Sequence, residues 1–170
     1  AVDVVAARGG RISVDPNARP ELMRDPAARQ ALDAVMARAS ILLPSTSDLA
    51  FLFPGLAEDD AVDRLISGGA GIVALKRGAA GAAVIANGAR HEVAPHRVTE
   101  IDPTGAGDCF CGAFVACLAH GRPVAEALRI ANAAGALAVT RRGPMEGNAD
   151  LPEIQRFLDR EDAAVAARRA

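Results

Sequence analysis

Hydrophobic and polar positions follow two different periods along this chain. Short apolar runs bounded by turn residues predict strands at residues 11–14, 41–43, 72–75, 82–86 and 91–93. Asn87-Gly88, between the last two runs, predicts a tight hairpin, and residues 98–101 form a further extended piece. Apolar residues three and four positions apart predict helices after Asp25-Pro26 and over residues 46–52, 61–66, 108–119, 123–138 and 153–158. This alternation of strands and helices predicts an α/β layered domain.

Two further expectations concern where elements begin and where the domain ends. Thr46 or Ser47 carries the hydroxyl expected at the cap of helix 46–52. We expect residues 1–160 to form one domain and residues 161–170 to form a frayed C-terminal tail.

The charge of the chain narrows the classes of function. Its 170 residues carry a formal net charge of -2. The sequence contains no basic stripe for a nucleic acid or a membrane surface to bind, and no long uncharged apolar run that would span a membrane. Because the first residues also lack a basic n-region, we expect a cytoplasmic protein with no nucleic-acid or membrane partner.

Sulfur and imidazole side chains show neither a disulfide pattern nor a metal pattern. Three cysteines share one apolar helical stretch and are expected to pack in the core: Cys109, Cys111 and Cys117. Three histidines have no triad or metal spacing and are expected at the surface or at helix ends: His91, His96 and His120.

The segment Gly105-Ala106-Gly107-Asp108 is the strongest candidate for chemistry. It follows an extended piece and opens a helix, whose first N–H groups lack intrahelical partners and favour an anion such as a phosphoryl group. Asp108, in the first turn, is suited to take a proton from an attacking hydroxyl. A simple turn followed by a favourable first-turn acid remains an alternative. The spacing fits neither a P-loop nor a dinucleotide-binding Gly-x-Gly-x-x-Gly motif.

The longer string Asp102-Pro103-Thr104-Gly105-Ala106-Gly107-Asp108, with Gly112-Ala113-Phe114-Val115 after it, resembles the C-terminal signature of the ribokinase-like (PfkB) carbohydrate kinases. The resemblance implies the C-terminal part of a ribokinase-like layered α/β/α domain, without the N-terminal half and lid, from a truncated piece or an incomplete gene product. It implies that Asp108 is the catalytic base in contact with the substrate. It also implies that Gly105, Ala106 and Gly107 supply N–H groups to the transferring phosphoryl group.

The same resemblance implies nucleotide-binding residues in two segments. One set lies in the loop that would follow the ATP phosphates and ribose: Lys76, Gly78 and Gly81. The other set would line the adenine pocket from a helix: Ala131, Asn132 and Gly135. A hairpin turn for the first set and a packed helix face for the second remain alternatives.

Metal and substrate residues are implied in the same way. Asp48, in Pro44-Ser45-Thr46-Ser47-Asp48, occupies the place of the family's Asn-x-x-Glu motif and would organise Mg²⁺, although a helix first-turn role is an equal alternative. Asp102 and Thr104, with the loop 142–145, would hold a monovalent cation. Arg19, after Asp15-Pro16-Asn17, would pair with a substrate carboxylate or face the phosphates, unless it is simply a solvated surface residue.

The resemblance thus predicts an ATP-dependent phosphotransferase that acts on a hydroxyl of a ketose or keto-sugar acid, closest to the 2-keto-3-deoxygluconate kinase, fructokinase and tagatose kinase branch. ATP and Mg²⁺ are the expected cofactors, and K⁺ is left open. A small sugar is the expected partner, and a homodimer of the full-length protein is left open. The alternatives are a nucleoside or sugar-phosphate kinase of the same family, and a truncated nucleotide-binding fragment without catalysis.

Overall fold

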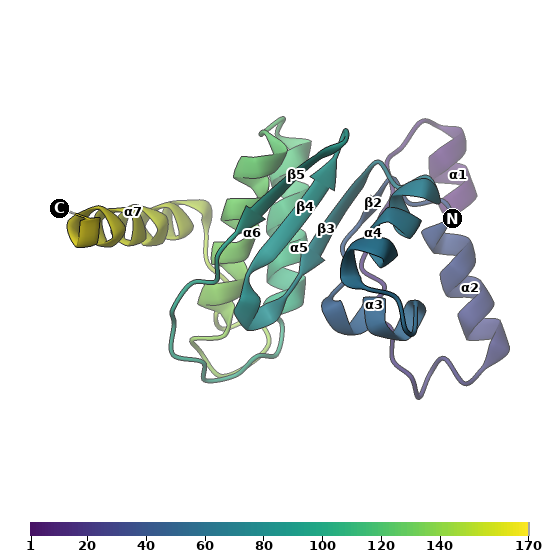
Figure 1. Ribbon diagram of the computed structural model, residues 1–170, viewed down its shortest axis with the longest axis horizontal. Coiled ribbons are helices and arrows are strands. Elements are labelled where there is room, and N and C mark those ends of the chain that lie inside the picture. The colour runs from purple at the N-terminus through teal and green to yellow at the C-terminus, as the bar shows by residue number, and fades with distance from the viewer. Residues whose placement is uncertain (170) are drawn as a thin grey trace. The chain divides into compact units, whose positions relative to one another are not determined.

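The computed structural model describes residues 1–169, which fall into two compact units, Ala1–Glu92 and the residues from Val93 onward (Figure 1). The described residues form seven α-helices and five strands, so the α/β class follows directly from the element order. The expectation of one domain over residues 1–160 stays a prediction.

A mixed five-stranded sheet is the frame of the first unit. Its strands lie in sequence order: β1 (Ser13–Val14), β2 (Ile41–Leu42), β3 (Ile72–Lys76), β4 (Ala82–Ala86) and β5 (Ala89–Val93). Strands β1, β2 and β3 are parallel, whereas β4 runs antiparallel to β3. The carboxyl ends of the three parallel strands therefore meet at one edge of the sheet. The residues that follow those ends are brought to this edge, which is where open α/β sheets place their binding sites.

Turn chemistry accounts for the order of the last three strands. A short 3-10 turn, η1 (Gly78–Ala80), joins β3 to β4. Asn87 and Gly88 both adopt positive φ, at 50° and 73°, between β4 and β5. Two consecutive positive φ values give the twist that a two-residue hairpin needs, so the hairpin predicted from Asn87-Gly88 is confirmed.

Four helices complete the first unit: α1 (Val2–Ala7), α2 (Pro26–Met36), α3 (Thr46–Leu52) and α4 (Glu58–Ser67). The Asp25 side chain accepts the Ala27 N–H, and Pro26 occupies the first turn, as the sequence predicted for the start of α2. The core is made by the inner faces of α3, α4 and β3, where Leu49, Val62 and Leu75 are buried. This packing fixes α3 against the sheet.

Three helices form the second unit: α5 (Ala106–Ala119), α6 (Val124–Ala138) and α7 (Leu151–Arg169). In Figure 1, α5 and α6 lie side by side. Gly135 of α6 permits this approach, because a Cβ there would stand 3.2 Å from the Ala106 carbonyl oxygen. Phe110 and Phe114 of α5 are buried with stacked rings 6.2 Å apart.

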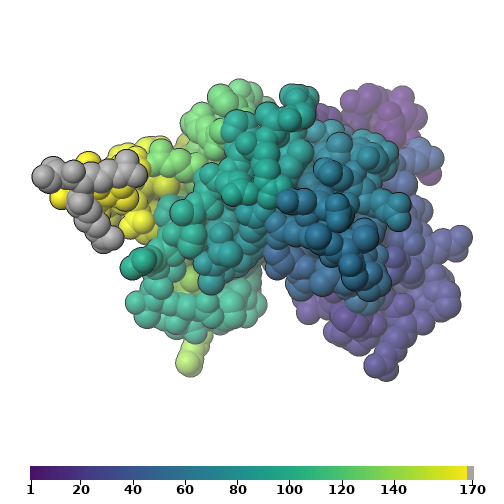
Figure 2. All heavy atoms as spheres, viewed as in Figure 1, coloured from purple at the N-terminus to yellow at the C-terminus, as the bar shows by residue number. Residues whose placement is uncertain are grey.

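Three element boundaries differ from the sequence prediction. Residues 98–101 form no strand. The last helix, predicted over residues 153–158, begins at Leu151 and runs to Arg169, in the C-terminal part of the chain coloured yellow in Figure 2, and the frayed tail over residues 161–170 stays a prediction. Ala170, the end of the expected tail, lies outside the described residues. Helix α3 is capped by Ser45, not by Thr46 or Ser47.

Several side-chain positions also refine the expectations. Cys117 is buried as predicted, and burial raises the pKa of its thiol, whereas Cys109 and Cys111 are only half-buried. His91 and His120 are exposed, and His120 ends α5. His96 is neither surface nor cap, because its ring packs edge-on against Phe157 at 5.0 Å. Within the described residues, no helix is both long enough and apolar enough to span a membrane.

Candidate active site at the N-terminus of helix α5

Gly105 is the N-cap of α5 and sets the geometry of the candidate site. Its φ of 83° lies in the left-handed region, which L side chains rarely adopt. A Cβ at this position would stand only 2.2 Å from the Pro144 carbonyl oxygen. The loop that follows α6 therefore lies directly against the start of α5, and only glycine fits between them.

The amide groups of the first turn of α5 are partly open. The Ala106 N–H donates to the Pro103 carbonyl at 3.3 Å, whereas the Gly107 and Asp108 amides have no acceptor among residues 1–169. Gly105 has no side chain that could cap them. Two N–H groups at the positive end of a helix dipole can therefore bind an anion.

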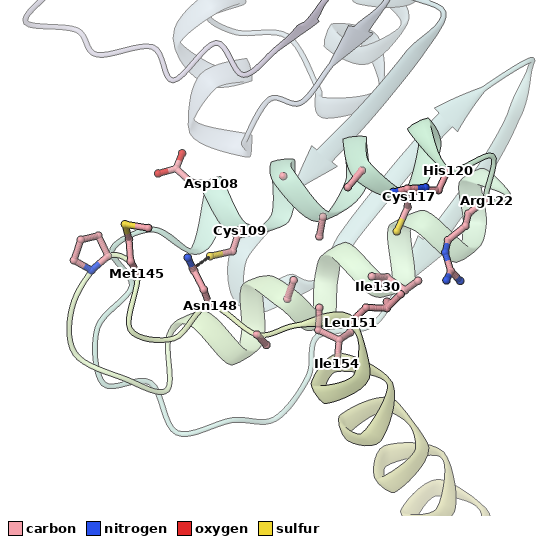
Figure 3. Close-up of a pocket in the computed structure, with 16 residues that line it drawn as sticks. Asp108, Cys109, Cys117, His120, Arg122, Ile130, Met145, Asn148, Leu151 and Ile154 are labelled. Atoms are coloured by element: carbon pink, nitrogen blue, oxygen red, sulfur yellow. Dashed lines mark hydrogen bonds between the residues drawn. The ribbon is translucent and has the colours of Figure 1, made fainter.

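Asp108 stands beside these amides in the same first turn. Its side chain is exposed, and Figure 3 shows the carboxylate directed away from the body of α5. No hydrogen bond joins it to another residue in the described part of the chain. A solvent-facing carboxylate next to an anion site has the arrangement that a general base for a hydroxyl nucleophile requires.

Asp102 joins the segment before α5 to the loop after α6. Its Oδ1 accepts the Thr104 N–H at 3.0 Å, and its Oδ2 accepts the Gly143 N–H at 2.9 Å. The Thr104 side chain, the Thr104 N–H and the Gly143 N–H hold the pKa of this carboxyl below its usual range. The sequence-predicted cation residues Asp102 and Thr104 are thus brought together with the loop 142–145, and the carboxylate stays charged there.

An apolar groove of about 1110 Å³ runs along α5 away from Asp108 (Figure 3). One face of α5, including Gly112 and Ala116, forms one wall, and Met145 and Leu151 line the rim. Near Asp108, the Cys109 thiol donates to the Asn148 side-chain oxygen at 2.7 Å. Burial, with the Asp108 charge second, raises the pKa of the Cys109 thiol, so Cys109 is not an activated nucleophile. No sequence pattern indicated this groove, because three segments from separate parts of the chain form it.

Asp48, the predicted magnesium residue in the first unit, is buried and fully engaged with protein donors. Its side chain is 4% exposed. Its Oδ1 accepts the Ala18 N–H at 2.7 Å, while its Oδ2 accepts the Ser45 N–H at 2.7 Å and the Ser45 hydroxyl at 2.5 Å. The Asp48 N–H donates in return to the Ser45 hydroxyl, which completes a capping box.

This donor set does not fit a magnesium ion at Asp48. Magnesium needs near-octahedral oxygen ligands and takes free carboxylate lone pairs, but three donors already surround these two oxygens. Among residues 1–169, no group of three or more His, Cys, Asp or Glu side chains could hold a metal. The first-turn alternative for Asp48 therefore agrees with its contacts, and its magnesium role stays a prediction without support from them.

The predicted phosphate loop begins with a lysine that makes a specific ion pair. The Lys76 ammonium donates to the Asp15 carboxylate, so the end of β3 is tied to the segment after β1. Gly78 and Gly81 adopt positive φ, at 54° and 88°, and close the η1 turn. Arg77, between Lys76 and Gly78, holds Glu58 and Glu92 at 2.5 and 3.1 Å. The loop is thus a fixed hairpin turn, and its nucleotide role stays a prediction.

Two of the three predicted adenine-wall residues have packing roles in α6. Ala131 has no exposed surface, and Gly135 lies against Ala106. Asn132 is half-buried, and its Nδ2 donates to the Ala94 carbonyl at 3.0 Å. The packed-helix alternative describes Ala131 and Gly135, and a nucleotide contact for all three stays a prediction.

Arg19, the predicted substrate residue, is exposed one residue beyond the amide that Asp48 holds. Within the portion of the chain that the structure covers, its guanidinium makes no ion pair. The sequence did not reveal the hydrogen bond between Asp48 and the Ala18 N–H, which positions Arg19. The one available signal was the capping-box spacing Ser45-x-x-Asp48, which indicates that Asp48 turns back toward its own helix cap.

Comparisons with known proteins agree with this architecture. A model of the pfkB family carbohydrate kinases matches residues 1–151. A fructokinase from Vibrio alginolyticus is 32% identical over 165 residues, which cover 93% of this chain and 54% of that protein. The chain spans about half the length of the relatives that it matches.

Solved structures that match this chain include proteins with bound nucleotides. A protein assigned as ribokinase II from E. coli, in complex with ATP and Mg²⁺, matches with a TM-score of 0.90 and 44% identity, over 94% of this chain and 52% of that one. A fructokinase double mutant from Vibrio cholerae O395, bound to fructose, ADP and potassium, matches with a TM-score of 0.84 and 28% identity, over 93% of this chain and 53% of that one. The predicted ribokinase-like fold class is confirmed.

Proposed function

Because the chain belongs to the pfkB family of carbohydrate kinases, we propose that it carries the phosphoryl-transfer side of an ATP-dependent sugar kinase. One observation carries the proposal: α5 begins at a glycine cap with two open amides, and Asp108 stands exposed beside them. A helix N-terminus with an adjacent free carboxylate supplies both an anion site and a base.

In the proposed reaction, a sugar hydroxyl attacks the γ-phosphorus of ATP. The Asp108 carboxylate accepts the hydroxyl proton as the new O–P bond forms, and ADP leaves with the electrons of the broken bond. The Gly107 and Asp108 amides donate to oxygens of the transferring group. Because the transition state is loose, orientation and charge stabilisation contribute more than the strength of the base.

This assignment keeps the Gly107 N–H of the predicted anion hole and replaces the Gly105 and Ala106 N–H groups with that of Asp108. The sequence pointed to the N–H groups of Gly105, Ala106 and Gly107, but the Ala106 amide already has the Pro103 carbonyl as a partner. We assign the hole to Gly107 and Asp108, with Gly105 as the residue whose φ opens it. The polar contacts of Lys76 and Arg77 would keep the η1 loop in one shape for the nucleotide.

Magnesium would accompany the nucleotide, as it does in the E. coli relative, and no step here is assigned to it. A monovalent cation would lie beside Asp102, Thr104 and the loop 142–145. The Asp102 carboxylate already accepts the Thr104 and Gly143 N–H groups, as Asp48 accepts its own donors, so K⁺ would have to share these oxygens; unlike Asp48, however, Asp102 is partly exposed. A bound cation would add positive charge near the start of α5.

A ketose or keto-sugar acid is the proposed acceptor. The Vibrio cholerae relative binds fructose, and the exposed Arg19 guanidinium has the forked geometry that suits a carboxylate. A nucleoside or sugar-phosphate acceptor is the second candidate within the family, and a nucleotide-binding fragment without catalysis is the third. Because the chain spans about half the length of these relatives, the activity is proposed for the whole protein.

The test is Asp108→Asn in the product of the complete gene, with fructose and a 2-keto-3-deoxy sugar acid as acceptors. We expect kcat to fall by about 10²- to 10⁴-fold, the usual contribution of a general base, with ATP affinity unchanged by calorimetry. Asp159→Asn, an exposed change on α7, is the matched control and should leave kcat unaltered. If Asp108→Asn keeps a kcat near that of the parent enzyme, the proposed base is wrong.

A further inference from the structure

We propose that Asp48 is a positioning residue, which holds the segment 15–19 so that Arg19 presents its guanidinium to an oxyanion of a bound ligand. This inference rests on the proposed kinase function for the identity of the ligand. It assigns Asp48 a role other than organising Mg²⁺, and it makes the segment 15–19 a preformed anion-binding segment of the first unit.

The first support is the set of contacts around Asp48. The carboxylate is buried at the start of α3, and α3 is packed into the core through Leu49. One of its oxygens binds Ser45 of its own helix cap, and the other binds the Ala18 N–H from a segment 30 residues earlier. Hydrogen bonds to an ionised acceptor are about twice as strong as neutral ones. The backbone at Ala18 is therefore fixed to the core through one side chain.

The second support is that the segment is held at its other end as well. The Asp15 carboxylate pairs with Lys76 and also accepts the Asn17 N–H at 3.1 Å. Pro16 is buried, and Asn17 adopts a left-handed φ of 38°, which Asn tolerates better than most residues. These contacts restrict the backbone conformation of the turn that leads into Ala18 and Arg19.

The result is a backbone segment held at Asp15 and at Ala18, followed by an exposed cation without an ion-pair partner among the described residues. Arg19 directly follows Ala18, whose N–H is bound by Asp48. Among the described residues, the Arg19 guanidinium has no carboxylate partner. A long side chain loses less freedom on binding when its backbone is already ordered, and a preorganised site gains affinity for that reason. The ligand group is an oxyanion, either the carboxylate of a sugar acid or a phosphate of the nucleotide.

Hydrogen exchange of the 170-residue chain or of the complete gene product tests the clasp without any assay of activity. In Asp48→Asn one of the two backbone N–H groups loses its acceptor, whereas in Asp48→Ala both do, so we expect the Ala18 amide to exchange at least about tenfold faster in Asp48→Ala. Asp33→Asn, an exposed change on α2, is the control and should leave exchange at Ala18 unchanged. Unchanged exchange at Ala18 in Asp48→Ala would overturn the proposal.

Kinetics then test the link to Arg19. We expect Asp48→Asn to raise KM for one anionic ligand about tenfold, with the magnesium concentration for half-maximal rate unchanged. Arg19→Ala should raise the same KM, and the double variant should be no worse than Arg19→Ala alone. A raised KM for the sugar acid but not for ATP identifies the carboxylate as the oxyanion, and the reverse identifies a phosphate.

Other outcomes would overturn the inference. A tenfold higher magnesium requirement in Asp48→Asn, or multiplicative effects of the two changes, would show that Asp48 acts independently of Arg19. If Asp48→Asn does not fold, Asn17→Gly loosens the turn without touching the carboxylate and should raise exchange at Ala18 and the same KM. Should the parent protein lack kinase activity, the proposed function fails while the exchange result still decides the clasp.

Discussion

Helices α3 and α5 each carry an aspartate at the third position of the first turn, yet their N-termini are built in opposite ways. In α3, Ser45 caps the helix, and the Asp48 carboxylate turns back to the cap and becomes buried. In α5, Gly105 is the cap and has no side chain, so Asp108 has no capping partner and faces outward. One N-terminus is closed by its own side chains and the other is left open.

The difference shows what determines the role of a first-turn acid. The same residue type experiences the same helix dipole in both helices. A hydroxyl at the N-cap converts the acid into a structural clasp, whereas a glycine in the left-handed region leaves both the amides and the acid available. The identity of the cap residue three positions earlier therefore separates the two roles.

The largest expected effect comes from closing the open end with Gly105→Ala. The added Cβ would meet the Pro144 carbonyl at 2.2 Å and would also have to adopt a left-handed φ. The start of α5 or the loop after α6 must then move by about 1 Å, which can cost about 10²-fold in kcat. The measurement is kcat and KM of the complete gene product.

Gly121→Ala is the matched control for this change. Gly121 has a similar φ of 73°, but nothing lies within 4 Å of a Cβ built there. It should cost about 1 kcal/mol of stability through backbone strain and leave kcat unchanged. Equal losses of kcat in the two variants would contradict a special role for the close approach to Pro144.

An intermediate effect is expected when each first-turn aspartate is replaced by alanine. Asp48→Ala leaves the Ala18 and Ser45 amides without acceptors and should lower the free energy of unfolding by about 2–4 kcal/mol. Asp108→Ala removes an exposed carboxylate and should change it by no more than about 0.5 kcal/mol. Urea unfolding of the two variants measures the difference, and equal losses of stability would remove the contrast between the closed and open ends.

The smallest effect concerns Asp102, which braces the open end. Its folded pKa is depressed by the Thr104 side chain and by the Thr104 and Gly143 N–H groups, so its stabilisation is present above the usual aspartate pKa of about 3.9. The stabilisation is lost as the pH falls through the lower folded pKa. Asp102→Asn should therefore lower Tm slightly at neutral pH, and the gap should close in acid. A difference in Tm between the two proteins that does not vary with pH would show that the ionised Asp102 carboxylate is not the source of the stabilisation.

Local sequence signals predicted much of the fold because they depend on neighbouring residues. Asn87-Gly88 is a hairpin signal by its backbone preferences alone, and Asp25-Pro26 is a helix start for the same reason. Gly105 to Asp108 could be recognised as an open helix N-terminus because glycine at the cap is a local property. The cap of α3 was missed because three consecutive candidates, Ser45, Thr46 and Ser47, differ only in how the chain enters the helix.

What the sequence determined by itself is the class of fold, the glycine-aspartate start of α5 and the family to which these residues belong. The cap residues Ser45 and Gly105 set the local difference between the two helix starts, but tertiary structure alone decided which distant backbone groups meet them. The Ala18 N–H reaches Asp48 across 30 residues, and the Pro144 carbonyl reaches Gly105 across 39. Such contacts form only when packing brings distant backbones together, because no local preference links positions so far apart in the chain.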